Sequence, residues 1–388
     1  MNHFYVASDF KKETIDAYDE LNKSFKNAKV VETYGSITLG NYLESGRATS
    51  QLQAIDLYDL KGYVEYSRQK NISFNYAING THMQNREFTE NGVMEIKTLL
   101  RDLYDAGIYS LTVAMPSLIK LVQSTGYDFE IKASTLCQVT NANKAAAYKN
   151  MGVDVIVVDE SINRDFKKLR NVREVFGDKV ELIVNPICQQ DCIYRPFHYN
   201  QTTTASVGNS NQISINFYEH NCVLQRYENF SKLLKISFVR PEDLKYYNSI
   251  GINHFKVQGR HTFLIGGDPV KTVKCYFEEK HDGNLMDLFS MFATENSFQV
   301  YVDNNKLKNF IKPFYEKENF CNHYCSKCNY CENFIKKCID PGKTNEIMNL
   351  AKAFYQDYDP FMELVDSVNP KEVLSAKNTQ KDNKDFIL

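Results

Sequence analysis

Short runs of β-branched and aromatic residues alternate with longer amphipathic stretches from residue 4 to about residue 260. The longer stretches favour helices. One of them, residues 143–151, has apolar and alanine residues at helical spacing and stops at Gly152, directly before an apolar run. Nine runs have the length and composition of strands. They are residues 4–7, 29–37, 72–78, 110–114, 129–134, 153–158, 181–185, 234–238 and 254–257.

Repetition of a helix followed by a buried strand predicts an α/β fold, most economically a (β/α)8 TIM-like barrel over residues 1–265. Nine candidate strands for eight places mean that one is accessory or mistaken. The rival is an open doubly wound sheet, which needs a glycine-rich phosphate turn near the N-terminus. Tyr34-Gly35-Ser36 with Gly40 does not have that spacing.

Polar residues follow the predicted strands, as expected at the mouth of a barrel, where catalytic groups lie at the carboxyl ends of strands. Turn chemistry alone also selects Gly, Asn, Ser and Pro at such places, so the pattern has a second interpretation. The segments include Glu32 to Ser36, Asn79 to His82, Ser134 to Gln138, Asp159 to Ser161, Arg240, and Gln258 to Arg260.

Residues 181–200 contain the highest density of potentially reactive or metal-binding side chains in the chain. Their apolar run breaks at Asn185-Pro186 and leads into Cys188, Cys192, Arg195, His198 and Tyr199. Two cysteines four residues apart can share one metal or cluster when other thiolates come from elsewhere. Inert buried thiols are the alternative. A Thr/Ser/Asn-rich insertion, residues 201–232, then brings Cys222, which either folds back toward these thiols or fills apolar space.

A helical, cysteine-rich extension is predicted over residues 266–368, with helices at 269–279, 285–293 and 307–318. Cys321, Cys325, Cys328 and Cys331 form a C-x3-C-x2-C-x2-C array. Thiolates at this spacing can surround an iron–sulfur cluster or a tetrahedral Zn²⁺, and the sequence leaves the metal open. Residues 369–388 are charged and polar, which predicts a flexible terminus.

Composition limits the classes of function that the sequence is compatible with. The 388 residues carry a formal net charge of −2, so there is no global basic field and DNA is not an expected partner, although a local basic patch stays possible. The sequence contains no run of 18 apolar residues, so we expect no membrane insertion, and it shows no signal-peptide pattern. We expect a cytoplasmic protein. In a reducing compartment, ten cysteines indicate metal or Fe–S ligation rather than disulfides.

Three segments resemble the collagenase-like peptidase family U32. They are residues 130–135, the Asn185-Pro-x-Cys188-x3-Cys192 loop with Phe197-His198-Tyr199-Asn200, and Lys256-Val-Gln-Gly259-Arg260. The resemblance implies a (β/α)8 barrel and, in several members, a [4Fe–4S] cluster held by four cysteines. By position, three of the ligands are Cys188, Cys192 and Cys222.

The fourth ligand position of the family falls near Ser237-Phe238, which is not cysteine. Cys137 or one thiol of the 321–331 array completes the cluster, or the array holds a cluster of its own. The family implies oxygen-independent hydroxylation of RNA or a quinone ring, or peptide modification. No Ser-His-Asp, Cys-His or His-Glu-x-x-His arrangement supports the peptidase name.

The leading hypothesis is therefore an Fe–S enzyme in which Arg195, His198 and Arg260 position an anionic small molecule, a peptide or an RNA. Each residue also has a structural alternative: a salt bridge for the arginines, and a hydrogen-bonded core residue for His198. Arg47 and His82 are weaker candidates. A peptidase is the second hypothesis. The third is a non-enzymatic subunit whose Zn- or cluster-bearing extension docks onto a protein partner.

Overall fold

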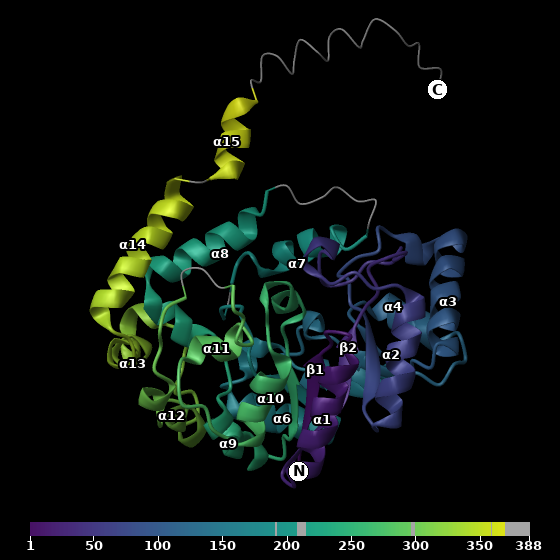
Figure 1. Ribbon diagram of the computed structural model, residues 1–388, viewed down its shortest axis with the longest axis horizontal. Helices are drawn as coiled ribbons and strands as arrows, with labels where there is room; N and C mark the ends of the chain where they lie inside the picture. Colours follow the sequence, from purple (N-terminus) through teal and green to yellow (C-terminus); the bar gives the residue numbers. More distant parts are fainter. Residues whose placement is uncertain (191, 208–214, 296–298, 358, 369–388) are drawn as a thin grey trace, which may run out of the picture.

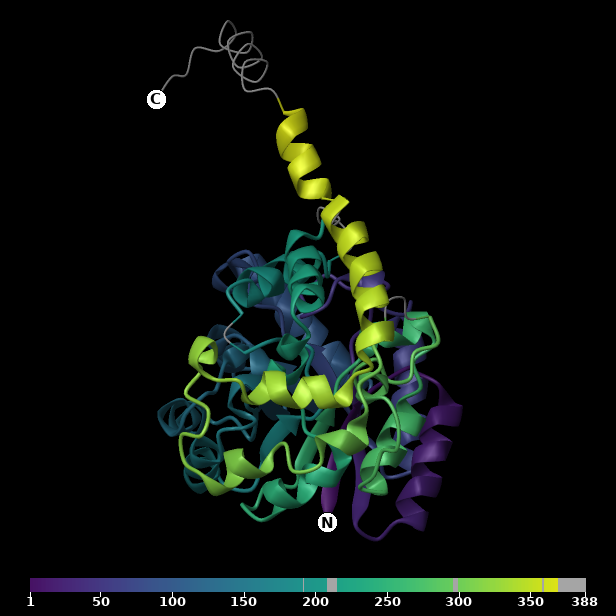
Figure 2. The same ribbon diagram turned by 90° about the vertical axis from the view of Figure 1, so that its left-hand side faces the viewer.

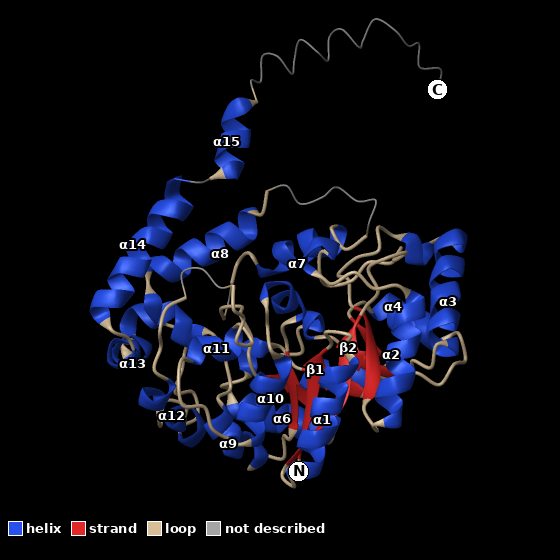
Figure 3. Cartoon of the chain, in the orientation of Figure 1, coloured by secondary structure: helices blue, strands red, loops and turns tan. Residues whose placement is uncertain are grey.

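The chain forms a closed barrel of eight parallel strands in sequence order, β1 to β8, which confirms the predicted fold class. The computed structural model describes residues 1–190, 192–207, 215–295, 299–357 and 359–368. Figure 3 shows the strands enclosed by helices. The strands are β1 Asn2–Ala7, β2 Ala28–Gly35, β3 Ser73–Ile78, β4 Ser110–Val113, β5 Glu130–Ala133, β6 Val155–Val157, β7 Val180–Ile183 and β8 His254–Val257.

The helices interleave with the strands and continue into the extension (Figure 1). They are α1 Lys12–Ser24, α2 Leu57–Gln69, α3 Glu90–Asp105, α4 Pro116–Gln123, α5 Ala142–Asn150, α6 Phe166–Phe176, α7 Arg195–Thr204, α8 Phe217–Glu228, α9 Leu244–Asn248, α10 Pro269–Phe277, α11 Leu285–Phe289, α12 Lys312–Glu316, α13 Tyr330–Cys338, α14 Pro341–Asp357 and α15 Pro360–Ser367. The helix expected over residues 143–151 corresponds to α5.

Eight of the nine predicted strands are present, and the ninth is wrong. Residues 234–238 form no ladder: Phe230–Lys235 is a 3-10 helix, and Ile236 makes a single isolated bridge to Gln189. The reason is topological. β7 pairs directly with β8, Glu181 opposite His254, so the barrel closes without a place for another strand.

Alternation along the strands separates two environments. Outward-facing Phe4 and Phe255 pack against each other, and Phe4 also packs against Tyr276 and Phe277 of α10. Inward-facing positions are unusually polar. The Lys132 ammonium lies 2.8 Å from Glu32 and 2.6 Å from Glu181, and all three side chains are buried. The barrel interior is therefore filled by a charged network as well as by apolar residues.

The ring of helices closes at α10, which follows β8 and packs against α1 and β1. It thus includes residues 269–277, which the sequence assigns to the extension. Beyond it, α13 contacts the 3-10 helix Phe230–Lys235, and α14 packs against α8. α15 projects away from the barrel (Figure 2). The predicted flexible terminus, residues 369–388, lies outside the described residues.

Candidate functional site

A small cavity of about 80 Å³ opens at the carboxyl ends of the strands. It is the place where barrels of this type carry their chemistry. α7 lies over this end of the barrel (Figure 1) and contributes Tyr199 to the cavity. The predicted mouth residues Asn79, Ser134 and Thr135 line the cavity, and so does Arg260. The further polar lining consists of Tyr34, Arg47, Thr112, Lys256 and Gln258.

Three cations face this cavity: Arg47, Lys256 and Arg260. The Arg260 guanidinium contacts the Ser36 hydroxyl at 3.4 Å, and the Lys256 ammonium lies 4.0 Å from the centre of the Tyr34 ring. Within the described part of the chain, no carboxylate forms an ion pair with any of the three. The mouth of the barrel therefore holds two buried cations, Lys256 and Arg260, and the half-buried Arg47, none of which forms an ion pair with a described residue.

Burial disfavours the charged forms of these side chains. It lowers the pKa of Lys256 to about 8, with Lys132 and Arg260 adding to the effect against the pull of Glu181. It also lowers the pKa of Arg260 to about 10, with a contribution from Arg47. A bound anion would reverse these shifts, since an opposite charge favours the charged form of each group.

Gly259 determines the direction in which the chain continues into Arg260. Its φ of +146° lies outside the range that side chains permit, and a Cβ there would meet the Met291 sulfur at 2.0 Å. β8 can therefore turn sharply at its end and place Arg260 back over the mouth. The Lys-x-x-Gly-Arg segment thus has a backbone reason for its glycine.

Two other cations of the barrel, Lys132 and Arg195, have carboxylate partners, unlike those of the mouth. Lys132 bridges Glu32 and Glu181. The predicted catalytic residue Arg195, at the start of α7, donates to Asp159 and lies 3.2 Å from Glu160. Although burial opposes it, these carboxylates raise the pKa of Arg195 above its usual value. Its charge is therefore neutralised within the protein, whereas that of Arg260 is not.

His198, the third predicted catalytic residue, follows Arg195 on α7. Burial lowers its pKa to about 4, and Arg47 adds to the shift. The imidazole is therefore neutral at pH 7 and close to the cationic mouth. In that state one ring nitrogen can accept a proton.

The barrel-loop thiols are only partly brought together. The Cys188 sulfur lies 3.8 Å from the Tyr199 hydroxyl, and Arg226 contacts the Cys222 sulfur at 3.2 Å. Burial raises the pKa of Cys188 to about 12, with Glu160 adding to it, and Cys222 also contributes. No contact joins Cys192 to these two among the residues described. Thiols are the ligands that Fe–S clusters use, so the donor type fits, but only three of four are supplied.

The candidate fourth ligands differ in position. The Cys137 thiol donates to the carbonyls of Val113 and Ala114 at the end of β4, away from the other thiols. Cys321 of the extension lines a cavity that also contains Gln190 of the barrel loop. In the described residues, no three His, Cys, Asp or Glu side chains are arranged around a common metal position.

Lys256 lines the mouth but is not among the candidate residues that the sequence analysis selects, and Arg47, a weaker candidate there, lines it as well. A signal for Lys256 was available: in a strand of period two, Lys256 and Gln258 share one face with His254. No feature of the sequence around Arg47 predicts that it reaches the mouth. It lies on the loop between β2 and α2. Its position depends on Gly46, where a Cβ would meet the Asn79 side chain at 2.8 Å.

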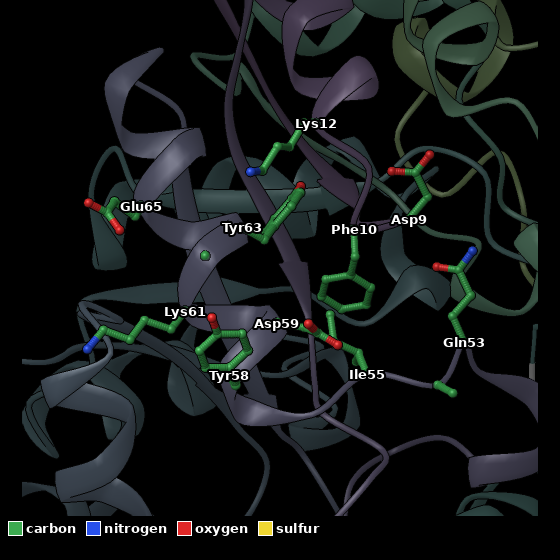
Figure 4. Close-up of a pocket in the computed structure, with 12 residues that line it drawn as sticks. Asp9, Phe10, Lys12, Gln53, Ile55, Tyr58, Asp59, Lys61, Tyr63 and Glu65 are labelled. Atoms are coloured by element: carbon green, nitrogen blue, oxygen red, sulfur yellow. The ribbon is translucent and has the colours of Figure 1, made fainter.

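A larger cavity lies elsewhere, between the loop after β1 and α2 (Figure 4). Its volume is about 850 Å³. Lys12, Asp59, Lys61 and Glu65 give it charges of both signs. Tyr58, at its edge, is 85% exposed. It is open to solvent, and its one strongly buried carboxyl, Asp9, accepts a hydrogen bond from the Thr14 hydroxyl at 2.7 Å, so we place the candidate site at the barrel mouth.

Fold and mouth together define a TIM-barrel protein with a cation-lined site at the carboxyl ends of its strands. A family model for peptidase family U32 matches residues 35–185. The chain is 30% identical over 297 residues to an "uncharacterized protease", MJ1657, from Methanocaldococcus jannaschii, covering 76% of this chain and 87% of the relative. The chain belongs to peptidase family U32.

Solved structures give weaker similarities. The U32 peptidase Mk0906 is 17% identical, with a TM-score of 0.48, over 66% of this chain and 92% of its own. A D-psicose 3-epimerase from Clostridium cellulolyticum H10 is 10% identical, with a TM-score of 0.35, over 65% of this chain and 100% of its own. The described part of this chain contains no helix that is long and apolar enough to span a membrane.

Proposed function

We propose that the chain is an enzyme whose substrate carries a carboxylate or phosphate group, bound at the barrel mouth by Arg47, Lys256 and Arg260. The observation that carries this proposal is the clustering of three cations around one cavity without carboxylate partners among the described residues. Arginine presents a planar fork that suits both anions. Small acids, peptide carboxylates and RNA phosphates all have the required chemistry.

One group at the mouth can exchange a proton near neutral pH. Lys256 has a pKa of about 8, whereas burial lowers the pKa of His198 to about 4 and keeps it neutral. General acid–base groups work best when their pKa lies near the operating pH. We propose that Lys256 is the group that takes up or releases a proton, with the anion held by the two arginines.

Arg260→Met should weaken anion binding about 10- to 100-fold, since a charge-assisted contact to a buried anion contributes roughly 1.5–3 kcal/mol. The measurement is the rise in melting temperature with inorganic phosphate against chloride at equal ionic strength. Wild type should be stabilised and Arg260→Met should not.

Arg195→Met is the matched control for the phosphate experiment, because Arg195 is paired with Asp159 and Glu160. That variant should melt lower but keep the phosphate response. Equal phosphate responses in wild type and Arg260→Met would contradict the proposed anion site.

We further propose that Cys188, Cys192 and Cys222 bind an iron–sulfur cluster beside the mouth. When bound, such a cluster supplies electrons for redox modification, of which oxygen-independent hydroxylation is one form. Supporting this is the donor type: Cys188, Cys192 and Cys222 are thiols, the ligands that Fe–S clusters use. The ten cysteines are all free thiols, as a reducing compartment requires.

Cys188→Ala should lower the iron and acid-labile sulfide content of anaerobically purified protein, whereas Cys137→Ala should not. Cys137 is the matched control because its thiol is bonded to backbone carbonyls. Unchanged iron in Cys188→Ala would remove the barrel loop as a cluster site.

The relative named a protease favours peptide hydrolysis as a second function. Cleavage that survives removal of iron would support that function over a redox one.

A further inference from the structure

Arg164 is a further buried cation that forms no ion pair with a described residue, and it lies far along the chain from those of the mouth. It lies just before α6 and is 7% exposed. One of its terminal nitrogens donates to the Leu234 carbonyl, but Nε and Nη2 are buried with no hydrogen-bond partner. Burial lowers the pKa of Arg164. A guanidinium in such a place is costly unless a negative group compensates it.

Nearby protein groups do not supply that negative charge. The guanidinium lies 4.5 Å from the centre of the Phe238 ring and 4.9 Å from that of Phe310, which offer only the weak attraction of aromatic faces. Asp243, the carboxylate that acts on it, is taken by Arg240 in a two-pronged contact at 2.8 and 2.9 Å. No carboxylate pairs with Arg164 among the described residues.

The cysteine array of the extension lies directly beside this cation. Arg164 and Cys321 line one cavity. Cys321, Cys325, Cys328 and Cys331 all line the adjoining cavity of about 110 Å³, to which Lys235 also contributes. Cys331 and Cys321 are among the groups whose charge acts on Arg164. Four thiols from eleven residues therefore share one cavity at the edge of an uncompensated guanidinium.

We propose that Cys321, Cys325, Cys328 and Cys331 bind a tetrathiolate metal centre, and that Arg164 is the buried counter-ion of this centre. Four thiols lose four protons on binding. Four thiolates around Zn²⁺, or around a [4Fe–4S]²⁺ cluster, leave a net charge of minus two. This charge would provide the counter-ion that Arg164 lacks among the described carboxylates. Lys235, which also lines the cavity, adds a second cation near the negative centre.

Metal binding requires the exposed part of the array to move. In the described residues the thiols do not yet surround a common position. Cys321, Cys325 and Cys328 are exposed, on a segment whose regular structure is the three-residue 3-10 helix Cys325–Lys327. Gathering them disturbs no core packing. Metal sites often complete their geometry only when the metal binds.

Cys331 provides the fixed point of the centre. It is the second residue of α13, directly after Tyr330. The Tyr330 ring packs on Phe310 and Phe320, and its hydroxyl donates to the Phe310 carbonyl at 2.8 Å. Phe310 in turn stacks on Phe238 from the barrel side. A metal centre here would therefore join the extension to the segment around Arg164, and its loss should loosen this contact.

The test is metal analysis of the full chain purified without oxygen, with zinc, iron and sulfide measured per chain. Cys328→Ser should lose one zinc, or one cluster's iron and sulfide, relative to wild type. Cys275→Ser is the control: it is free and half-buried but outside the array. Zinc without sulfide identifies a zinc centre, and iron with sulfide identifies a cluster. Equal metal in wild type and Cys328→Ser would overturn the proposal.

Arg164→Met tests the counter-ion separately. Groups around the ligands of a metal site typically change its affinity 10- to 100-fold, so chelator competition should show metal held at least tenfold more weakly, with Arg164→Lys in between. Removing an unpaired buried charge should leave the metal-free protein folded. Unchanged chelator resistance in Arg164→Met would refute the role of Arg164. The Arg260→Met phosphate response is independent, so failure here leaves the mouth proposal standing.

Discussion

Replacing Lys132 with Met should lower the free energy of unfolding at pH 7 by about 3–5 kcal/mol, because breaking a buried ion pair leaves charges uncompensated. Lys132 contacts Glu32 and Glu181 in the barrel interior, and all three are almost fully buried. Burial alone would lower the pKa of Lys132, but the two carboxylates outweigh it and raise the pKa above its usual value. Methionine keeps the shape of the side chain and removes only the charge.

The loss of unfolding free energy in Lys132→Met should depend on pH, and its direction can be derived. Without Lys132, Glu32 loses the ammonium that opposes the effect of its burial and faces the buried Glu181, so the pKa of Glu32 rises further. Burial already raises the pKa of Glu32. The folded variant then binds more protons than the unfolded chain, so the deficit shrinks as pH falls from 8 to 5.

Urea denaturation of Lys132→Met at pH 8 and pH 5 measures this effect. Lys179→Ala is the control, because Lys179 makes an exposed ion pair with Glu130 at 2.7 Å. Its removal should cost less than about 1 kcal/mol. A Lys132→Met variant as stable as wild type would show that the network does not hold the barrel together.

The same substitution at Lys256 should act in the opposite direction, raising the free energy of unfolding at pH 7 by about 1–3 kcal/mol. Lys256 lies over a tyrosine ring at 4.0 Å, as Lys132 does over Tyr5. It differs in having no carboxylate in contact within the described residues. Its pKa is lowered to about 8, chiefly by burial. Retaining the charged form therefore costs stability.

The pH range of this gain follows from the sign of the shift. The unfolded chain has a lysine pKa of about 10.4, so between pH 8 and 10.4 it binds more protons than the folded chain. The penalty from Lys256 is complete below pH 8 and disappears as pH rises through that interval. The difference between Lys256→Met and wild type should therefore be largest at pH 7 and small at pH 10. A destabilised variant at pH 7 would contradict the account.

These opposite signs reflect one principle. Lys132, Arg195 and Arg240 have carboxylate partners and contribute to the fold. Lys256 and Arg260 are buried without such partners, and we expect them to reduce stability. Residues that cost stability commonly do so where function requires them. The uncompensated cations therefore mark the places where an anionic group from outside the fold belongs.

The barrel could be predicted from the sequence because short apolar runs alternate with amphipathic stretches and polar segments follow most of the strands. The extra strand over residues 234–238 could not be rejected in the same way. Its composition suits a strand, and only the direct pairing of β7 with β8 excludes it.

The candidate site was predictable only in part. Arg260 could be expected at the mouth because it ends a strand. Whether an arginine is paired is a property of tertiary contacts, so the sequence could not separate Arg195 from Arg260. Arg164 carried no local signal, since its importance comes from what surrounds it after folding.

Crystals of the full chain soaked in sodium selenate, with diffraction recorded at the selenium absorption edge, test the central claim most directly. We predict an anomalous peak in the mouth cavity within hydrogen-bonding distance of Arg260, and no such peak in Arg260→Met crystals. A mouth without selenium, with Arg260 turned onto a carboxylate of the protein, would contradict the account.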